Sequence, residues 1–358
     1  MPSLPKVAVY GAGKVGRELI KVLIRDGIQG GLLLADPNHT MQEVIDLFNQ
    51  DFTYGLPDKC NQYSSDEIGL QMPNGLFQVI KFVQETDRSL LPLVQQKIDI
   101  AIDCSGNTNN ITTCAAQFLS AGALNVITIV PSNISTTERN AIASDGGLTI
   151  YDVNESNHSG NKWYIPDAQF ISCTLPSMLI NKYLNNKGYF IDNISLDLQT
   201  SNLENSLLTS YKGYGSINGT LTDTSNYIGR LFGIISPALN GKVFSTVVKY
   251  PLGQGNVSKI SIINDNTLTP SDIQSILTDS SNAIGKDDLS TKSKNTSGWF
   301  KVSTCDANNG KYFLNHMINL GEAATIDRRT KNTFYIGYDA TNVMVCETKL
   351  IIVLIAGL

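Results

Sequence analysis

The sequence predicts an α/β protein, with a doubly wound parallel sheet in its first half and an α+β part with a mainly antiparallel sheet in its second half. A glycine-rich turn follows the first apolar run, and apolar runs alternate with helical stretches up to about residue 131. From residue 189 onward, strand-like runs dominate. At 358 residues, 42% hydrophobic and 16% charged, the chain can bury the cores of two domains.

The first half follows a strand-helix-strand order. Residues 7–10 read as an apolar strand, residues 17–24 as a helix and residues 32–35 as a second strand. Further along we expect a helix at 41–50, a β pair within 69–83, a strand at 98–104, a helix at 111–120 and a strand at 125–130 closed by Pro131. The polar passage 132–169 mixes helix-like and strand-like pieces. This alternation is typical of a parallel sheet covered by helices.

The second half begins with an apolar helical run at 177–184, with Gly188 as its stop. We expect strands at 191–198, 242–250, 257–263, 300–304 and 333–337, a helix at 272–284 and a polar loop at 287–297. The apolar terminal stretch 350–358 is far shorter than the roughly 20 residues that a membrane helix needs. It therefore predicts a buried element.

Composition excludes several classes of function. The net charge of -5 gives no basic field for nucleic acid. Six cysteines are scattered without a CxxC pair, and no secretory leader precedes the first strand, so we expect reduced thiols and a cytoplasmic protein. We expect no metal site and no membrane partner.

The first βαβ unit carries a dinucleotide fingerprint. Gly11 permits the tight turn, Gly13 lets the backbone approach a pyrophosphate, and Gly16 lets the helix pack on the strand. Asp36 ends the next strand, where its carboxylate favours NAD by accepting from ribose hydroxyls and repelling a 2′-phosphate. Ordinary packing glycines are the alternative. The expected cofactor residues are Gly11, Gly13, Lys14, Val15, Gly16, Asp36, Ser105 and Gly106.

Several landmarks follow one another along the chain: the fingerprint, Asp36-Pro37, 103–106 (Asp-Cys-Ser-Gly), 172–174 (Ser-Cys-Thr), 237–242 (Pro-Ala-Leu-Asn-Gly-Lys), 256–258 (Asn-Val-Ser) and Tyr338-Asp339. In the order and spacing of these landmarks, the chain resembles the glyceraldehyde-3-phosphate dehydrogenase family over nearly its whole length. The resemblance implies NAD, a small aldehyde or sugar-phosphate substrate, a glycolytic oxidoreductase and a homotetramer. It also implies an NAD-binding Rossmann domain at 1–172, completed by 338–358, and a catalytic and oligomerisation domain at 173–337.

Cys173 is the candidate nucleophile. We expect it at the N-terminus of the helical run, with Pro176 in the first turn, where the helix dipole would favour a thiolate. A thiolate attacks an aldehyde to give a thiohemiacetal that surrenders hydride to nicotinamide. A small buried hydrophobe is the alternative, and it is the reading that we favour for Cys104 and Cys114.

Departures from the family pattern weaken this chemistry. The family's histidine base is missing, and Gln199 or a neighbour takes its place; a positioned base is worth about 10² to 10⁴ in rate. Lys249 replaces a phosphate-binding arginine, and Asn226 lies in an altered phosphate turn. The loop 201–223 keeps only Lys212 as a basic residue, and Ala340 replaces an asparagine that holds the nicotinamide. Ser172 and Thr174 remain candidate phosphate donors.

Two hypotheses follow. The first is an NAD-dependent aldehyde dehydrogenase that uses Cys173 and is impaired by the missing base. The second is an inactive protein of dehydrogenase fold that serves as a nucleotide-binding, scaffold or interaction protein. A semialdehyde dehydrogenase is a weaker alternative, because that family lacks the Leu-Asn-Gly-Lys landmark at 239–242. The sequence identifies neither the aldehyde nor the acyl acceptor.

Overall fold

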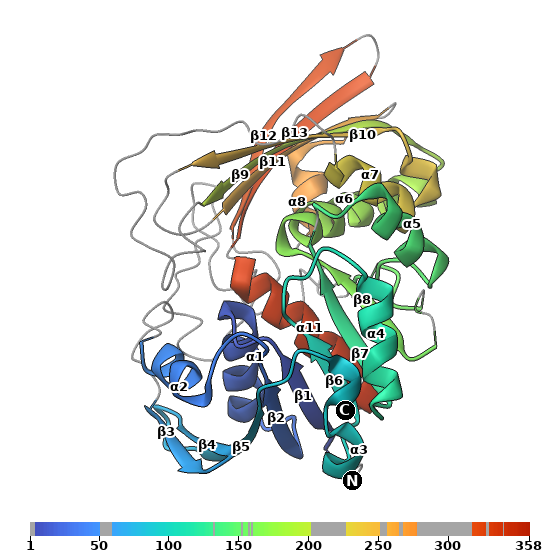
Figure 1. Ribbon diagram of the computed structural model, residues 1–358. Coiled ribbons are helices and arrows are strands. Elements are labelled where there is room, and N and C mark those ends of the chain that lie inside the picture. The colour runs from blue at the N-terminus through green and yellow to red at the C-terminus, as the bar shows by residue number, and fades with distance from the viewer. Residues whose placement is uncertain are drawn as a thin grey trace.

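Two sheets, one above the other in Figure 1, form the frame of the computed structural model. The structure describes residues 4–50, 59–131, 133–151, 153–156, 158, 160–201, 227–250, 256–264, 268–277, 317–326, 329–338 and 340–358. The expected α/β class, with a parallel-rich first sheet and a mainly antiparallel second sheet, is confirmed.

Sheet A has eight strands in the order β3-β4-β5-β2-β1-β6-β7-β8. The six strands from β5 to β8 in this order are parallel to one another, and β4 and β3 extend the sheet beyond β5 as antiparallel strands. The strands are β1 (Lys6–Tyr10), β2 (Gly31–Ala35), β3 (Lys59–Ser64), β4 (Glu67–Gln71), β5 (Phe77–Val83), β6 (Ile100–Asp103), β7 (Asn125–Val130) and β8 (Lys162–Pro166). Because the chain reverses its winding direction between β1 and β6, a crevice opens at their carboxyl ends, where doubly wound sheets bind ligands.

Helices and short turns connect these strands. They are α1 (Lys14–Arg25), α2 (Met41–Asn49), the 3₁₀ turn η1 (Arg88–Leu90), α3 (Leu93–Gln96), α4 (Ile111–Ser120) and α5 (Thr136–Ser144). α2 begins with a full capping box between Thr40 and Glu43. The strands β1, β2, β6 and β7 are nearly continuous apolar runs buried on both faces, as expected for a covered parallel sheet.

Sheet B has the order β10-β9-β11-β13-β12, and only its β9-β10 pair is parallel. Its strands are β9 (Ile191–Ser201), β10 (Val243–Tyr250), β11 (Asn256–Asn264), β12 (Met317–Ile326) and β13 (Arg329–Tyr338). Among the described residues of this part, the helices are α6 (Ala168–Asn186), α7 (Tyr227–Ile235), α8 (Pro270–Leu277) and the 3₁₀ turn η3 (Pro237–Leu239). The expected strand 300–304, the loop 287–297 and the end of the helix expected at 272–284 lie outside the described residues.

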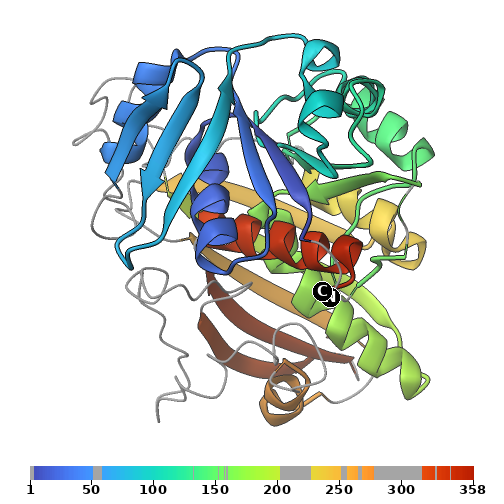
Figure 2. The ribbon, with the colours of Figure 1, turned by 90° about the horizontal axis from the view of Figure 1, so that it is seen from below.

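The terminal helix α11 (Ala340–Ala356) packs against both α1 and α6. Figures 1 and 2 show it running between sheet A and the second part of the chain. The expected buried terminal element is therefore a helix, whose last residues are exposed. The boundary expected at 172/173 falls inside α6, so the division into two domains stays a prediction.

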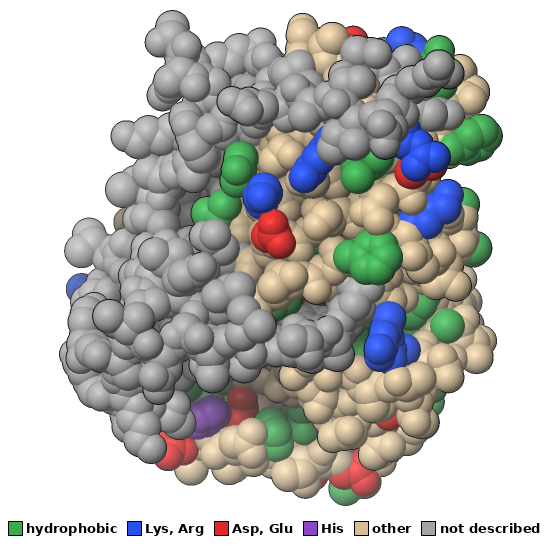
Figure 3. Space-filling model, turned by 90° about the horizontal axis from the view of Figure 1, so that it is seen from above, with side chains coloured by type: hydrophobic (Ala, Val, Ile, Leu, Met, Phe, Trp, Pro, Cys, Tyr) green, Lys and Arg blue, Asp and Glu red, His purple; other side chains and the backbone are tan. Residues whose placement is uncertain are grey.

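The described surface is mixed in character. On the face seen in Figure 3, basic and acidic side chains are interspersed, and hydrophobic side chains occur singly or in small groups. Scattered apolar exposure of this kind is normal for a protein surface. No helix in the described part of the chain is long and apolar enough to cross a membrane.

Candidate functional site

A cavity of about 350 Å³ lies where the carboxyl ends of sheet A face the second part of the chain. The beginnings of three helices, α1, α6 and α11, meet there with the ends of β6 and β7 and the start of β11. The lining residues are Gly13, Lys14, Val15, Cys104, Ile129, Pro131, Asp167, Ala168, Gln169, Asn256, Ala340, Thr341 and Met344. We call it the cofactor pocket, because it occupies the crevice in which this fold binds dinucleotides.

The glycine turn has the geometry that its sequence predicts. Gly11 adopts a φ of +106°, which only glycine adopts readily, and a Cβ on Gly16 would collide with the Gly11 carbonyl oxygen. A Cβ on Gly13, in contrast, would meet no atom within 4 Å beyond its own neighbours along the chain. Gly13 precedes α1 and provides no side-chain cap, so the first turn of α1 faces the space that a pyrophosphate would fill. The turn therefore fits a dinucleotide.

Asp36 is buried at the end of β2 and organises this turn. Its Oδ2 accepts from the Ala12 N–H at 2.6 Å, and its Oδ1 accepts from the N–H groups of Asn38 and His39 at 2.8 and 2.9 Å. The His39 Nδ1 lies 3.0 Å from Oδ1. Since Oδ2 has one such partner and a carboxylate oxygen can accept about two hydrogen bonds, Oδ2 keeps capacity for a ribose hydroxyl.

Ser105 and Gly106 follow β6 but do not line the cavity; the adjacent Cys104 does. The Ser105 hydroxyl donates to Asp103 Oδ1 at 2.6 Å, and Arg88 Nε donates to Asp103 Oδ2 at 2.9 Å. The guanidinium of Arg88 also lies over the Tyr10 ring, 4.3 Å from its centroid. This cluster fixes the end of β6 beside β1. Ser105 therefore has a structural partner of its own at the rim of the crevice.

The expected position of Cys173 is wrong. α6 begins at Ala168, capped by the Asp167 side chain, which accepts from the Phe170 N–H at 3.1 Å. Cys173 consequently lies in the second turn, is 0% exposed and does not line the pocket. Burial raises the pKa of its thiol to about 12, which the nearby Ser258 hydroxyl only partly offsets. The helix continues through Pro176, so that proline is not in the first turn.

The candidate phosphate donors beside Cys173 share its burial. Ser172 and Thr174 are both 0% exposed, and their hydroxyl oxygens have no hydrogen-bond partner. Neither lines the cofactor pocket. The pocket is instead lined by the first turn of α6, where Gln169 is half-buried.

The other expected substrate residues lie on sheet B or outside the description. Gln199 on β9 pairs in register with Val257, the neighbour of the pocket residue Asn256. Lys249 on β10 pairs with Thr200, so both strands carry their candidates at the end of sheet B that includes Asn256. Asn226 and Lys212 lie outside the described residues.

Several pocket residues were not singled out from the sequence. Ile129 and Pro131 lie at the carboxyl end of a strand that the sequence already indicates. The rule that ligands bind at the carboxyl ends of parallel strands therefore predicts both as pocket residues. Asp167, Ala168 and Gln169 could have been found from an N-cap pattern, since Asp167 follows a strand-ending proline and precedes an apolar run. Cys104, expected to pack, lines the pocket, and burial followed by the Asp103 charge raises the pKa of its thiol.

The fold, a doubly wound sheet followed by a mainly antiparallel sheet with a pocket at the carboxyl ends of the parallel strands, is of the class in which doubly wound sheets bind ligands. The chain is similar to glyceraldehyde-3-phosphate dehydrogenase of Eremothecium gossypii, 22% identical over 274 residues that cover 76% of this chain and 78% of the relative. It is also similar to glyceraldehyde-3-phosphate dehydrogenase 3 of Kluyveromyces marxianus, with 23% identity, and to glyceraldehyde-3-phosphate dehydrogenase of Borreliella burgdorferi, with 24% identity. Each of these two matches covers 76% of this chain and 78% of the relative. No protein-family model matches. The chain is thus a divergent relative of the glyceraldehyde-3-phosphate dehydrogenases, as its motifs predict.

Proposed function

We propose that this protein binds NAD(H) through its dehydrogenase fold and does not oxidise aldehydes through a cysteine thiolate, so that it acts as a nucleotide-binding or interaction protein. One observation carries the proposal: Cys173 is enclosed in the core, one helical turn beyond the part of α6 that lines the cofactor pocket. Of the two hypotheses, the geometry favours the inactive one.

The nucleotide part of the proposal rests on the glycine turn and Asp36. The first turn of α1 offers N–H groups to a pyrophosphate beside the open side of Gly13. Asp36 offers a carboxylate where the adenosine ribose would lie. The dehydrogenase relatives support NAD as the ligand. Bound NAD supplies a hydride acceptor, and the chain itself supplies binding and orientation.

The catalytic part fails on two requirements of the chemistry. A nucleophilic cysteine must be largely ionised and must reach the substrate, but a thiol with a pKa of about 12 is neutral at pH 7, and that of Cys173 is buried. The residues of α6 that line the pocket are Ala168 and Gln169, and neither a methyl group nor an amide is a nucleophile or a base. Aldehyde oxidation through Cys173 would require a rearrangement that exposes this thiol to the pocket.

Assembly belongs to the same proposal. Relatedness to the glyceraldehyde-3-phosphate dehydrogenases suggests a homo-oligomer, a tetramer by resemblance. A protein whose role is binding rather than turnover still needs both folded sheets, but it does not need a reactive thiol.

Calorimetric titration with NAD, followed by an assay of NADH formation from glyceraldehyde-3-phosphate with and without phosphate, tests both parts. We expect NAD binding, and no NADH formation above the protein-free background in either the parent or the Cys173→Ser variant. NADH formation that disappears in Cys173→Ser would overturn the catalytic part. Turnover that survives that substitution would overturn it as well, by indicating another group in the pocket, and absence of NAD binding would overturn the nucleotide part.

A further inference from the structure

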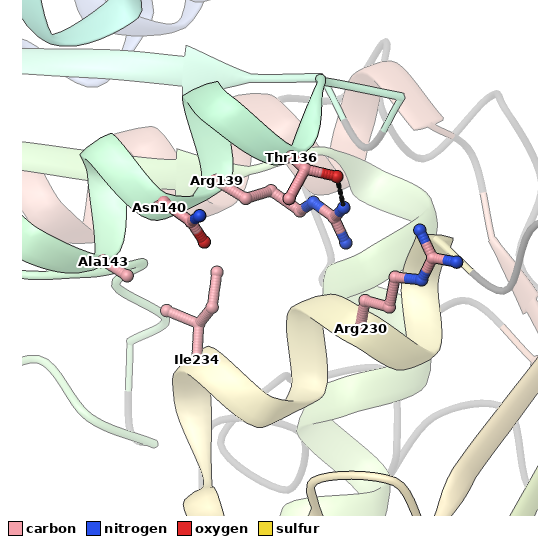
Figure 4. Close-up of a pocket in the computed structure, with 6 residues that line it drawn as sticks. All are labelled: Thr136, Arg139, Asn140, Ala143, Arg230 and Ile234. Carbon is pink, nitrogen blue, oxygen red and sulfur yellow. Dashed lines mark hydrogen bonds between the residues drawn. The ribbon is translucent and has the colours of Figure 1, made fainter.

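A second pocket, of about 320 Å³, lies between α5 and α7, away from the cofactor pocket. It is lined by Thr136, Arg139, Asn140, Ala143, Arg230 and Ile234. Figure 4 shows the two guanidinium groups at the same end of this pocket, with Ala143 and Ile234 toward the other end. α5 follows a strand of sheet A and α7 packs on β10 of sheet B, so the pocket joins the two parts of the chain.

Arg139 is a buried cation with incomplete pairing. Its side chain comes from α5, it is only 9% exposed, and its Nη2 donates to the Thr136 hydroxyl at 2.6 Å. Its Nε is buried without a hydrogen-bond partner. Since a buried charge with an unsatisfied N–H is costly, the arrangement calls for an acceptor in the pocket.

Arg230 adds a second positive charge rather than a partner. Burial, and after it the charge of Arg230, lowers the pKa of Arg139. No carboxylate lines the pocket, and within the described part of the chain neither arginine forms an ion pair. The acid next to Arg139, Glu138, is occupied: its two oxygens accept from the Asn110 and Ile111 N–H groups at 2.8 and 3.0 Å, at the start of α4.

We propose that this pocket binds the phosphoryl group of a small phosphate monoester. Guanidinium groups match phosphate oxygens in a forked geometry, and two of them approaching without a carboxylate leave an anion as the missing partner. Thr136 begins α5, whose N-terminal dipole also favours an anion. The amide of Asn140 can donate a hydrogen bond to the ester oxygen. Ala143 and Ile234 provide an apolar wall for the organic part of the ligand.

The size and shape of the pocket favour a small molecule over a peptide. Its volume lies at the lower end of the range of small-ligand sites, about 300 to 1,000 Å³. The more buried guanidinium lies within the concavity, where an extended acidic chain would have less access than a single phosphoryl group. Because Arg139 and Arg230 come from the two parts of the chain, the bound anion would hold α5 and α7 together.

Calorimetric titration with inorganic phosphate and with phenyl phosphate, at constant ionic strength, tests the proposal on the full chain. The variant Arg230→Ala removes an exposed side chain and leaves the core intact. The matched control is Lys182→Ala, which removes one positive charge from an exposed position on α6 outside the pocket. Arg139→Met, which keeps the apolar stem length, is the second variant.

We expect phenyl phosphate to bind more tightly than inorganic phosphate, with affinity reduced at least tenfold in Arg230→Ala and within twofold of the parent in Lys182→Ala. If Arg139→Met fails to fold, the Arg230→Ala comparison still decides. Equal affinity in the parent and Arg230→Ala would overturn the site, including where phosphate binds elsewhere, such as at α1. Tighter, Arg230-dependent binding of a hexaglutamate peptide than of phenyl phosphate would overturn the small-molecule assignment.

Discussion

Gln169 and Cys173 lie on successive turns of α6, and only Gln169 lines the cofactor pocket. The difference of one turn decides the chemistry. At the first turn a side chain meets the pocket and the positive end of the helix dipole, whereas at the second turn the polypeptide encloses it and desolvation disfavours the thiolate.

The first prediction concerns thiol reactivity. Under native conditions and brief, substoichiometric iodoacetamide, Cys173 should remain unlabelled, because its thiol is 0% exposed and neutral. Mass spectrometry should find it labelled only after unfolding in urea. The sequence alone favours Cys173 as the most reactive thiol, and its preferential labelling in the native protein would restore that interpretation.

The second prediction moves the thiol by one turn. In Gln169→Cys, the new side chain should face the cofactor pocket at the start of α6, so labelling at position 169 should be at least tenfold faster than at Cys173. Saturating NAD should slow it by covering the pocket. Serine at position 169 is the matched control for folding. Equal protection of residues 169 and 173 would contradict the placement of the pocket.

The third prediction separates two glycines of one motif. Gly13→Ala fits sterically, so stability should change by less than about 1 kcal/mol, while NAD affinity should fall at least about tenfold, or ~1.4 kcal/mol, because the methyl group occupies the pyrophosphate space. Gly16→Ala should cost about 1–3 kcal/mol of stability, since its Cβ would meet rigid backbone. Urea unfolding and calorimetry measure the two effects. Loss of stability in Gly13→Ala with unchanged affinity would reverse the assignment.

The fourth prediction is a preference for NAD over NADP. The Asp36 carboxylate faces the glycine turn, and a 2′-phosphate beside it would meet a like charge. We expect NADP to bind at least about tenfold more weakly than NAD. In Asp36→Asn, the ratio of NAD affinity to NADP affinity should be smaller than in the parent. Titration of both nucleotides against both proteins is the measurement, and comparable affinities in the parent would rule out this role for Asp36.

The sequence predicts the frame well because its signals are local. α4 and β7 have the expected bounds, and the glycine turn and Asp36 lie where the fingerprint indicates. The start of α6 at Ala168 is missed, because Pro176 reads as a first-turn proline although tertiary burial carries the helix through it. The strands β3 and β12 are missed, because their polar or small residues give weak alternation. The arginine pocket depends on two segments about 90 residues apart, which no local pattern connects.

The last prediction concerns pH and the buried Glu347 on α11. This residue is 0% exposed; its Oε1 accepts from the Tyr151 N–H at 2.6 Å, and its Oε2 is buried without a partner. Burial raises the pKa of its carboxyl from the ordinary 4.5 to about 8, and the charge of Glu155 adds to the rise. The folded protein therefore keeps this group protonated at neutral pH.

The sign of the effect follows from proton counts. Below pH 4.5 both folded and unfolded states hold the proton, and above about pH 8 both have lost it. Between these values the unfolded state binds fewer protons, so the contribution of Glu347 to the unfolding free energy falls as pH rises, by up to ~1.4 kcal/mol per pH unit.

Glu347→Gln keeps the Oε1 acceptor but cannot ionise. Its stability relative to the parent should therefore increase with pH by a few kcal/mol in total. Urea unfolding at pH 5 to 8.5 measures this difference, and the same substitution at a half-buried glutamate, Glu67→Gln on β4, is the control. A constant difference for Glu347→Gln across the same range would show that the carboxyl at position 347 ionises normally in the folded protein.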